Sequence, residues 1–260
     1  IEPDYLQGLA ASPTGGYLAG EEQNTLATID TDSYSVFGQI DYDLTDELVL
    51  VSGLRLVREN KSMDGQLRQN ANLVDRDIEV DYGIDPLVDV AMDNDETMWS
   101  AKLQLDYKPN SDTLLYAGIN RGVKAGNFNA PLGGSFSTYD AEVLLAYEAG
   151  AKLTLMDGKA QLNSSIFYYD YSDYQSFSWV NNAGVVFNED AQFTGAEVEL
   201  LLNPIDALDI MFGVSYTDAV VEDLEVASGV FVDTTPPYTP EWQSSGLVRY
   251  TWDIDSGSIA

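Results

Sequence analysis

The chain lacks cysteine and histidine altogether, and basic residues are scarce. Without a thiol or an imidazole, thiol catalysis, Ser-His-Asp chemistry, zinc fingers and most transition-metal sites are excluded. Only 12 Lys and Arg stand against 43 Asp and Glu, a formal net charge of -31. A field of this sign repels nucleic acid phosphates. The sequence therefore favours neither an enzyme nor a nucleic-acid-binding protein.

Long apolar runs are also missing, since no stretch of about 18 apolar residues occurs. Aromatic residues are plentiful instead, with 16 Tyr, 4 Trp and 9 Phe. Tyrosine suits surfaces on which one end of the ring stays wet, such as an interface or a ligand surface. The sequence predicts no transmembrane helix, and it leaves both a membrane protein and a tyrosine-rich soluble β-protein open.

Apolar and polar residues alternate with a period of two along much of the chain, which is the pattern of half-buried β-strands. In Thr97–Lys108, for example, Trp99 and Leu103 fall on one face and Lys102 on the other. The pattern predicts about nine strands, with a tenth that begins near the C-terminus. The predicted strands are Tyr34–Leu44, Glu47–Glu59, Thr97–Lys108, Leu114–Lys124, Leu145–Leu155, Ala160–Tyr174, Gln192–Asn203, Asp209–Val220 and Thr239–Trp252.

These predicted strands are long. Typical globular strands have about 5–6 residues, whereas most of these have about 10–14, and a strand that crosses a bilayer needs about 9–11. Their polar faces carry charged residues in mid-strand, which would be costly to bury in a sandwich. An apolar face towards lipid and a polar face towards a wet lumen avoid this cost.

Short and long links alternate between the predicted strands. The short links Thr45-Asp46, Pro109–Asp112, Met156–Lys159 and Pro204–Leu208 contain the usual turn residues. The long links are Asn60–Glu96, Ala125–Val143, Gln175–Ala191 and Val221–Tyr238. This arrangement is typical of outer-membrane barrels, with short periplasmic turns and long extracellular loops. The predicted fold is an all-β, transmembrane, antiparallel barrel with up-and-down connections, here a partial barrel of about 9–10 strands.

The stretch Leu114–Pro131 reads LLYAGINRGVKAGNFNAP, a strand that ends in a polar, glycine-rich rim. It resembles a strand-and-loop motif of TonB-dependent outer-membrane receptors, and the matching positions are Gly122, Lys124, Gly126, Phe128 and Asn129. The stretch Ala146–Gln175 looks like the next hairpin of that family. The resemblance extends over roughly Tyr34 to Trp252.

The resemblance implies active uptake through a barrel of about 22 strands that is closed by an N-terminal plug. It implies the TonB–ExbB–ExbD complex as the energising partner and a ferric siderophore as the cargo, with a saccharide or cobalamin as alternatives. We expect residues 34–260 to be the C-terminal half of the barrel, residues 1–33 to be an extracellular loop or strand remnant, and the plug to be absent. The implied location is the outer membrane of a Gram-negative bacterium, in contact with its lipid and lipopolysaccharide.

Two groups of candidate site residues follow from the strand faces and the resemblance. Residues expected to face the lumen, where they contact the plug, line the substrate path or keep the wall solvated, are Arg55, Lys102, Glu148, Lys152, Glu197 and Glu199. Residues expected to contact a ligand at the rim or in the loops are Lys124, Phe128, Asn129, Tyr139, Trp179 and Phe187. Arg121 falls by parity on the lipid face near the rim, where it either touches a lipopolysaccharide phosphate or extends along the surface towards water.

No catalytic residue, resident cofactor or dedicated metal site is predicted. The acidic link before Trp99, and Asp93–Glu96 within it, has the oxygen ligands that Ca²⁺ prefers. It lacks the spacing and the glycine of an EF-hand loop, so a solvated acidic loop is the favoured expectation. Competing functions are a passive porin-like barrel and a soluble β-rich binding or adhesion module, and the order of the receptor-like motifs argues against the porin.

Overall fold

The computed structural model describes residues 21–71, 86–130, 136–180, 183–254 and 257–259. Within these ranges, ten strands form one antiparallel sheet. They are β1 (Glu21–Asp43), β2 (Leu48–Ala71), β3 (Pro86–Asn110), β4 (Thr113–Lys124), β7 (Glu142–Leu155), β8 (Ala160–Val180), β9 (Ala183–Ile205), β10 (Leu208–Ala227), β11 (Val230–Thr234) and β12 (Trp242–Tyr250). Two separate short pairs are β5 (Asn127–Asn129) with β6 (Ser137–Tyr139), and β13 (Trp252–Ile254) with β14 (Gly257–Ile259). No helix among these residues is long and apolar enough to cross a membrane.

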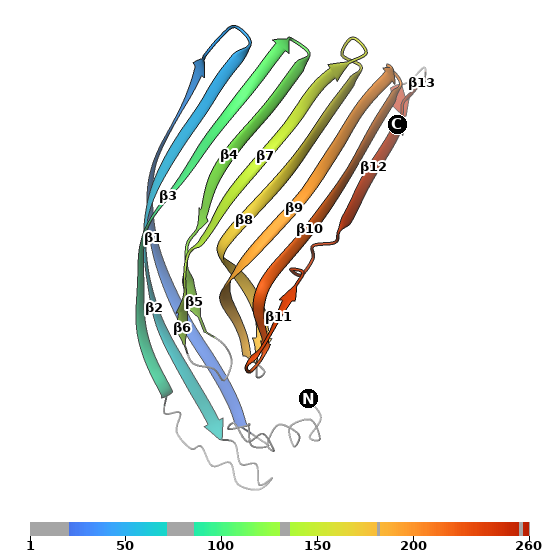
Figure 1. Cartoon of the computed structure of the whole chain (residues 1–260). Coiled ribbons are helices and arrows are strands. Elements are labelled where there is room, and N and C mark those ends of the chain that lie inside the picture. Colours follow the sequence, from blue (N-terminus) through green and yellow to red (C-terminus); the bar gives the residue numbers. More distant parts are fainter. Residues whose placement is uncertain (1–20, 72–85, 131–135, 181–182, 255–256, 260) are drawn as a thin grey trace.

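Neighbouring strands of the sheet follow one another in the chain, apart from the short β5–β6 pair between β4 and β7. At the far edge, β12 pairs with residues 208–216 of β10 and β11 with residues 221–227. The sheet curves into an open arc from β1 to β12 (Figure 1). The predicted partial barrel with an antiparallel meander is confirmed.

The strands extend well into segments that the sequence pattern assigned to loops. β2 and β3 pair continuously from Leu48 opposite Tyr107 to Leu67 opposite Val88, so residues 60–67 and 88–96 of the predicted link Asn60–Glu96 are paired strand. β8 and β9 likewise pair as far as Val180 opposite Ala183. Residue 33 lies inside β1 and does not mark a structural boundary. The predicted strands were too short at the loop side. The reason is that the polarity of the outward and concave faces changes along each strand.

That change is visible on the three strands β1–β3. We call the face that carries the β5–β6 pair the concave face. Lys61 of β2 lies on this face, since it donates a hydrogen bond to the chain just before β5. On the opposite, outward face, Leu103 is 54% exposed, whereas further along β3 the outward residues are Asp93 and Asp95. On the concave side, Met63 is only 1% exposed. The apolar side is therefore outward in one part of the strand and inward in the next, as expected where a strand leaves lipid for water.

Outward aromatic residues mark two levels of the sheet. Trp99 and Tyr107 of β3 are eight residues apart, and so are Trp242 and Tyr250 of β12. Eight residues span about 26 Å along a strand, or about 20 Å across a membrane at a tilt of about 40°. This is close to the apolar band of about 25 Å in outer-membrane barrels. The outward aromatics of the loop-side level are Trp99, Tyr147, Tyr168, Tyr216 and Trp242.

The turns at the other end are short, as predicted. The Thr45 hydroxyl accepts hydrogen bonds from the backbone N–H groups of Glu47 and Leu48 at 3.2 and 3.1 Å. The turn between β7 and β8 places Met156 and Asp157 at φ 54° and Gly158 at φ 88°. Side-chain capping and a glycine at positive φ allow the chain to reverse within a few residues.

Candidate functional site

A segment between β4 and β7 crosses the concave side of the sheet. We call residues 125–140 the strap, of which 125–130 and 136–140 are described. The strap contains β5 and β6, which pair from Asn127 opposite Tyr139 to Asn129 opposite Ser137. It bonds to β2 and β3 on one side and to β8 and β9 on the other, as the following contacts show. A segment held in this way is fixed against the concave face of the sheet.

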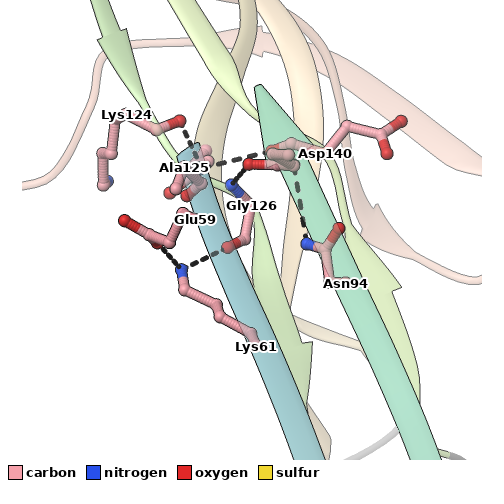
Figure 2. Close-up of polar contacts among 9 residues, drawn as sticks. Glu59, Lys61, Asn94, Lys124, Ala125, Gly126 and Asp140 are labelled. Carbon is pink, nitrogen blue, oxygen red and sulfur yellow. Dashed lines mark hydrogen bonds and ion pairs between the residues drawn. The ribbon is translucent and has the colours of Figure 1, made fainter. Parts of the chain in front are cut away.

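The first anchor joins the strap to β2 and β3. Lys61 donates from Nζ to the carbonyl oxygen of Gly126 at 2.6 Å and pairs with Glu59 at 2.7 Å (Figure 2). The N–H of Gly126 donates to Glu96 at 3.1 Å, and Asn94 lies beside that carboxylate. Glu59 and Glu96 are direct partners in the register of β2 and β3. Like charges opposite each other destabilise a sheet, so Lys61 has a double role, as counter-charge and as donor to the strap.

The second anchor is Gln175 of β8, which holds both ends of the strap. Its Nε2 donates to the carbonyl oxygens of Ala125 at 2.9 Å and Asp140 at 3.2 Å. Its own backbone N–H donates to Glu142 at 2.9 Å. One side-chain amide therefore keeps the entry and the exit of the strap close together.

The third anchor uses two asparagines that each bond to both polar groups of one backbone residue. Asn129 accepts from the N–H of Val186 at 2.9 Å and donates to its carbonyl at 3.0 Å. Asn188 of β9 accepts from the N–H of Asp140 at 2.7 Å and donates to its carbonyl at 3.0 Å. A side-chain amide can replace a strand partner in this way because it has one acceptor and two donors. The strap is thus attached to β9 by contacts that resemble a β-ladder.

Two glycines allow the close approach of the strap to its surroundings. A Cβ atom at Gly126 would lie 2.3 Å from the carbonyl oxygen of Tyr139, within the strap. A Cβ atom at Gly65 of β2 would lie 2.8 Å from the ring of Phe136. Both distances are far below van der Waals contact, so a side chain at either position would displace the strap.

A polar pocket of about 540 Å³ lies on the concave face between the two aromatic levels, and Glu148, Lys152, Glu197 and Glu199 are among its lining residues. Tyr116 donates to Glu148 at 2.6 Å, and Asn163 donates to Glu199 at 3.0 Å. Within the described part of the chain, none of the three carboxylates forms an ion pair. The pocket therefore has unneutralised negative charge that suits a cationic group.

The strand register places all six expected lumen residues on the concave face. Arg55 lies opposite Ser100 and Lys102 opposite Asn120, and the other four line the pocket just described. Arg55 donates to Ser35 at 3.3 Å, away from the pocket. Their contact with a plug or a substrate remains a prediction.

The structure does not gather the six expected ligand residues into one surface. Phe128 and Asn129 are each only 7% exposed, and the Asn129 amide is already used by Val186 and Ser137. Lys124 is exposed at the end of β4, and Tyr139 is half-buried in β6. Phe128 and Asn129 therefore belong to the strap, and contact of the six residues with a ligand stays a prediction.

The aromatic residues Trp179 and Phe187 lie on opposite faces of the β8–β9 hairpin. The register shifts by one residue between Tyr171 and Tyr174, where Asp173 has φ 56°. Such a bulge reverses which face each later residue points to. Trp179 is 62% exposed beside Phe177, whereas Phe187 packs against the buried cluster of Ala191, Val221 and Leu224. The sequence analysis grouped both residues because they lie in one predicted loop, which the structure shows as the paired ends of β8 and β9.

Carboxylates concentrate at the loop-side rim near β9 and β10. Partial burial and the neighbouring Asp223, Asp190 and Glu225 raise the pKa of Glu189. No group of three acidic residues among the described positions is arranged to hold a metal ion. Much of the acidic link considered for Ca²⁺, including Asp75 to Asp85, lies outside the described residues. A Ca²⁺ site there stays a prediction.

Sequence reasoning missed the residues that anchor the strap from outside it. Lys61 and Glu96 fell in a predicted link, Glu59 ended a predicted strand, and Gln175 and Asn188 fell in another link. The pairing between these links and the strap joins residues far apart in the chain. Gly126 and Asn129 stood out in the sequence as positions of the motif, and Asn129 was interpreted as a ligand contact.

An open, curved antiparallel sheet with an apolar outward band, short turns on one side and an inward strap defines the wall of an outer-membrane receptor barrel. The family profile described as TonB dependent receptor-like, beta-barrel matches residues 3–258. The chain belongs to this family.

Solved structures support the same fold. The ferric yersiniabactin uptake receptor FyuA from Yersinia pestis is 17% identical, with a TM-score of 0.70 over 95% of this chain and 34% of that one. The ferric-catecholate import receptor Fiu from E. coli K12 is 16% identical, with a TM-score of 0.64 over 86% and 32%. The copper transporter OprC is 17% identical, with a TM-score of 0.54 over 74% and 28%. The chain spans about a third of the length of these proteins.

Proposed function

We propose that the protein to which this chain belongs takes up a scarce solute across the outer membrane of a Gram-negative bacterium, energised by TonB, ExbB and ExbD through a plug domain. The observation that carries the proposal is the match of almost the whole chain to the TonB-dependent receptor barrel. The apolar outward band and the polar concave face fit a barrel wall between lipid and water. The function is transport, not catalysis.

The proposed cargo is a ferric siderophore. Two of the solved structures with this fold carry the names of receptors for ferric chelates, FyuA and Fiu. At 17% identity or less they support the fold and only suggest a cargo, and OprC is named for copper. A saccharide or cobalamin remains the alternative. In this proposal the strap forms the rim that the cargo passes, and the concave carboxylate pocket faces the plug.

Uptake by the full-length receptor tests the proposal. The receptor is expressed in a Gram-negative strain without its own siderophore receptors, and accumulation of radioactive iron is measured from a panel of ferric chelates. We expect uptake from at least one chelate, and none in a matched strain without TonB. Uptake that persists without TonB would indicate a passive barrel. Growth on a saccharide or cobalamin, with no iron uptake, would assign the cargo to the alternative class.

A further inference from the structure

The outward face of the sheet has an apolar groove of about 800 Å³ in the band that faces lipid. Its floor is the cross-strand pair Ala117 and Ala149, whose small side chains leave the surface hollow. Leu105 lies on one side and Ile166 on the other, since the register runs Leu105, Ala117, Ala149, Ile166 across four strands. A groove of this size and lining fits an extended hydrocarbon chain.

The loop-side end of the groove is formed by larger residues. Ile119 and Tyr147 are direct cross-strand partners above the two alanines, and Tyr147 neighbours Tyr168 with ring centroids 6.2 Å apart. Tyrosine at this level belongs to the aromatic belt, where lipid tails give way to head groups. The groove therefore begins at head-group depth and continues into the apolar layer.

Arg121 lies directly above this end, two residues beyond Ile119 on the same face of β4. Its guanidinium lies 4.0 Å from the centre of the Trp99 ring and donates to the Trp99 carbonyl oxygen. Within the described residues it has no carboxylate partner. Stacking fixes the orientation of the guanidinium and leaves its remaining N–H groups free for an anion.

Arg58, another outward arginine of the described strands, is not available for an anion in the same way. Arg58 pairs with Asp95 at 3.2 Å and donates to Thr97 at 3.1 Å. Further along β3, the same face carries Asp93 beyond Asp95. These carboxylates repel a phosphate that approaches the part of β2 and β3 beyond Trp99, so Arg121, which lies over Trp99 itself, is the favoured position for an anionic head group.

We propose that this groove and Arg121 form a binding site for one lipopolysaccharide molecule, with an acyl chain of its lipid A in the groove and a lipid A phosphate on the Arg121 guanidinium. Phosphate and guanidinium match in geometry as well as charge. Lipopolysaccharide is chosen over phospholipid because the site lies on the loop side, which the proposed function places at the cell exterior. The inference rests on that location and does not depend on the cargo.

The test counts lipopolysaccharide bound to the full-length receptor after extraction from outer membranes in mild detergent. Native mass spectrometry gives the number and type of lipids retained by the wild type and by Arg121→Gln, Ala149→Trp and Arg58→Gln. Arg58→Gln is the matched control, because it removes an outward arginine that already has a partner. Recovery in the outer-membrane fraction, with a folded-barrel shift on unheated gels, checks location and folding separately from lipid binding.

We expect one lipopolysaccharide per wild-type receptor, a loss of about tenfold or more in Arg121→Gln, a similar loss in Ala149→Trp, and no loss in Arg58→Gln. If Ala149→Trp does not fold, Arg121→Gln alone decides. Equal retention in wild type and Arg121→Gln would overturn the site, as would Arg121-dependent retention of phospholipid. A receptor absent from the outer membrane would contradict the proposed location instead.

Discussion

Replacement of Lys61 by methionine tests whether the strap depends on its buried ion pair. The side chain of Lys61 is only 10% exposed and that of Glu59 only 16%. Methionine keeps most of the length and removes the ammonium, so Glu59 and Glu96 face each other without a counter-charge and the Gly126 carbonyl loses its donor. Removing one partner of a buried ion pair costs about 3–5 kcal/mol.

The effect on the strap is smaller than that value, because the two carboxylates can turn towards solvent once the strap has detached. We expect the free energy of local opening of the strap to fall by about 2–4 kcal/mol. This corresponds to roughly 30- to 900-fold faster hydrogen exchange of the strap amides. Hydrogen exchange with mass spectrometry on the full-length receptor measures this at residues 125–130 and 136–140. Residues 208–216 pair on both sides with other strands, so the exchange rate of peptides from this segment should be unchanged.

Two further variants make the reasoning refutable. Lys124→Met is the control, because the Lys124 side chain is exposed and its ammonium has no partner in the described structure. Glu59→Gln added to Lys61→Met should restore part of the protection, since it removes one of the opposed charges. Exchange in Lys61→Met equal to that of the wild type would refute the argument, and so would an equal increase in Lys124→Met.

Three other changes test the remaining contacts. Asn129→Ala removes both hydrogen bonds to Val186, and limited proteolysis should cut the strap sooner by about tenfold or more. Gly126→Ala places a methyl group against the Tyr139 carbonyl oxygen and should raise strap exchange with no change in membrane insertion, measured by gel shift. Glu189 has a raised pKa in the folded state, so its ionisation destabilises the rim as pH rises from its ordinary value of 4.5. Glu189→Gln should therefore raise the unfolding temperature at pH 7 and have no effect at acid pH; an equal effect at both would contradict this.

The lipid-facing part of the sheet is predictable from sequence because one physical rule acts on it. Lipid requires an apolar outward face, and the concave face must be wet, so Leu103 and Lys102 follow in strict alternation. The short turns are equally predictable, because Thr45 and Gly158 act on their immediate neighbours. Where the constraint is local or repeats every second residue, one sequence is enough.

The loop-side part is not predictable in the same way. Beyond the membrane both faces of the sheet meet water or the strap, so the polarity of a residue no longer indicates which face it lies on. In addition, the bulge at Asp173 reverses the two faces of β8 without a clear sequence signal. The strap is held by backbone groups of Gly126, Val186 and Asp140, which have no residue-specific pattern. Long-range contacts of this kind are fixed by the folded sheet.

The distribution of charge separates two roles along the path through the barrel. Glu148, Glu197 and Glu199 lie on the concave wall between the aromatic levels, with Lys152 as the nearby cation. An anionic chelate would be repelled there, whereas basic side chains of a plug would be attracted. The exposed ammonium of Lys124 lies instead at the strap end of β4. We therefore propose that the rim meets the cargo and that the carboxylate pocket contacts the plug.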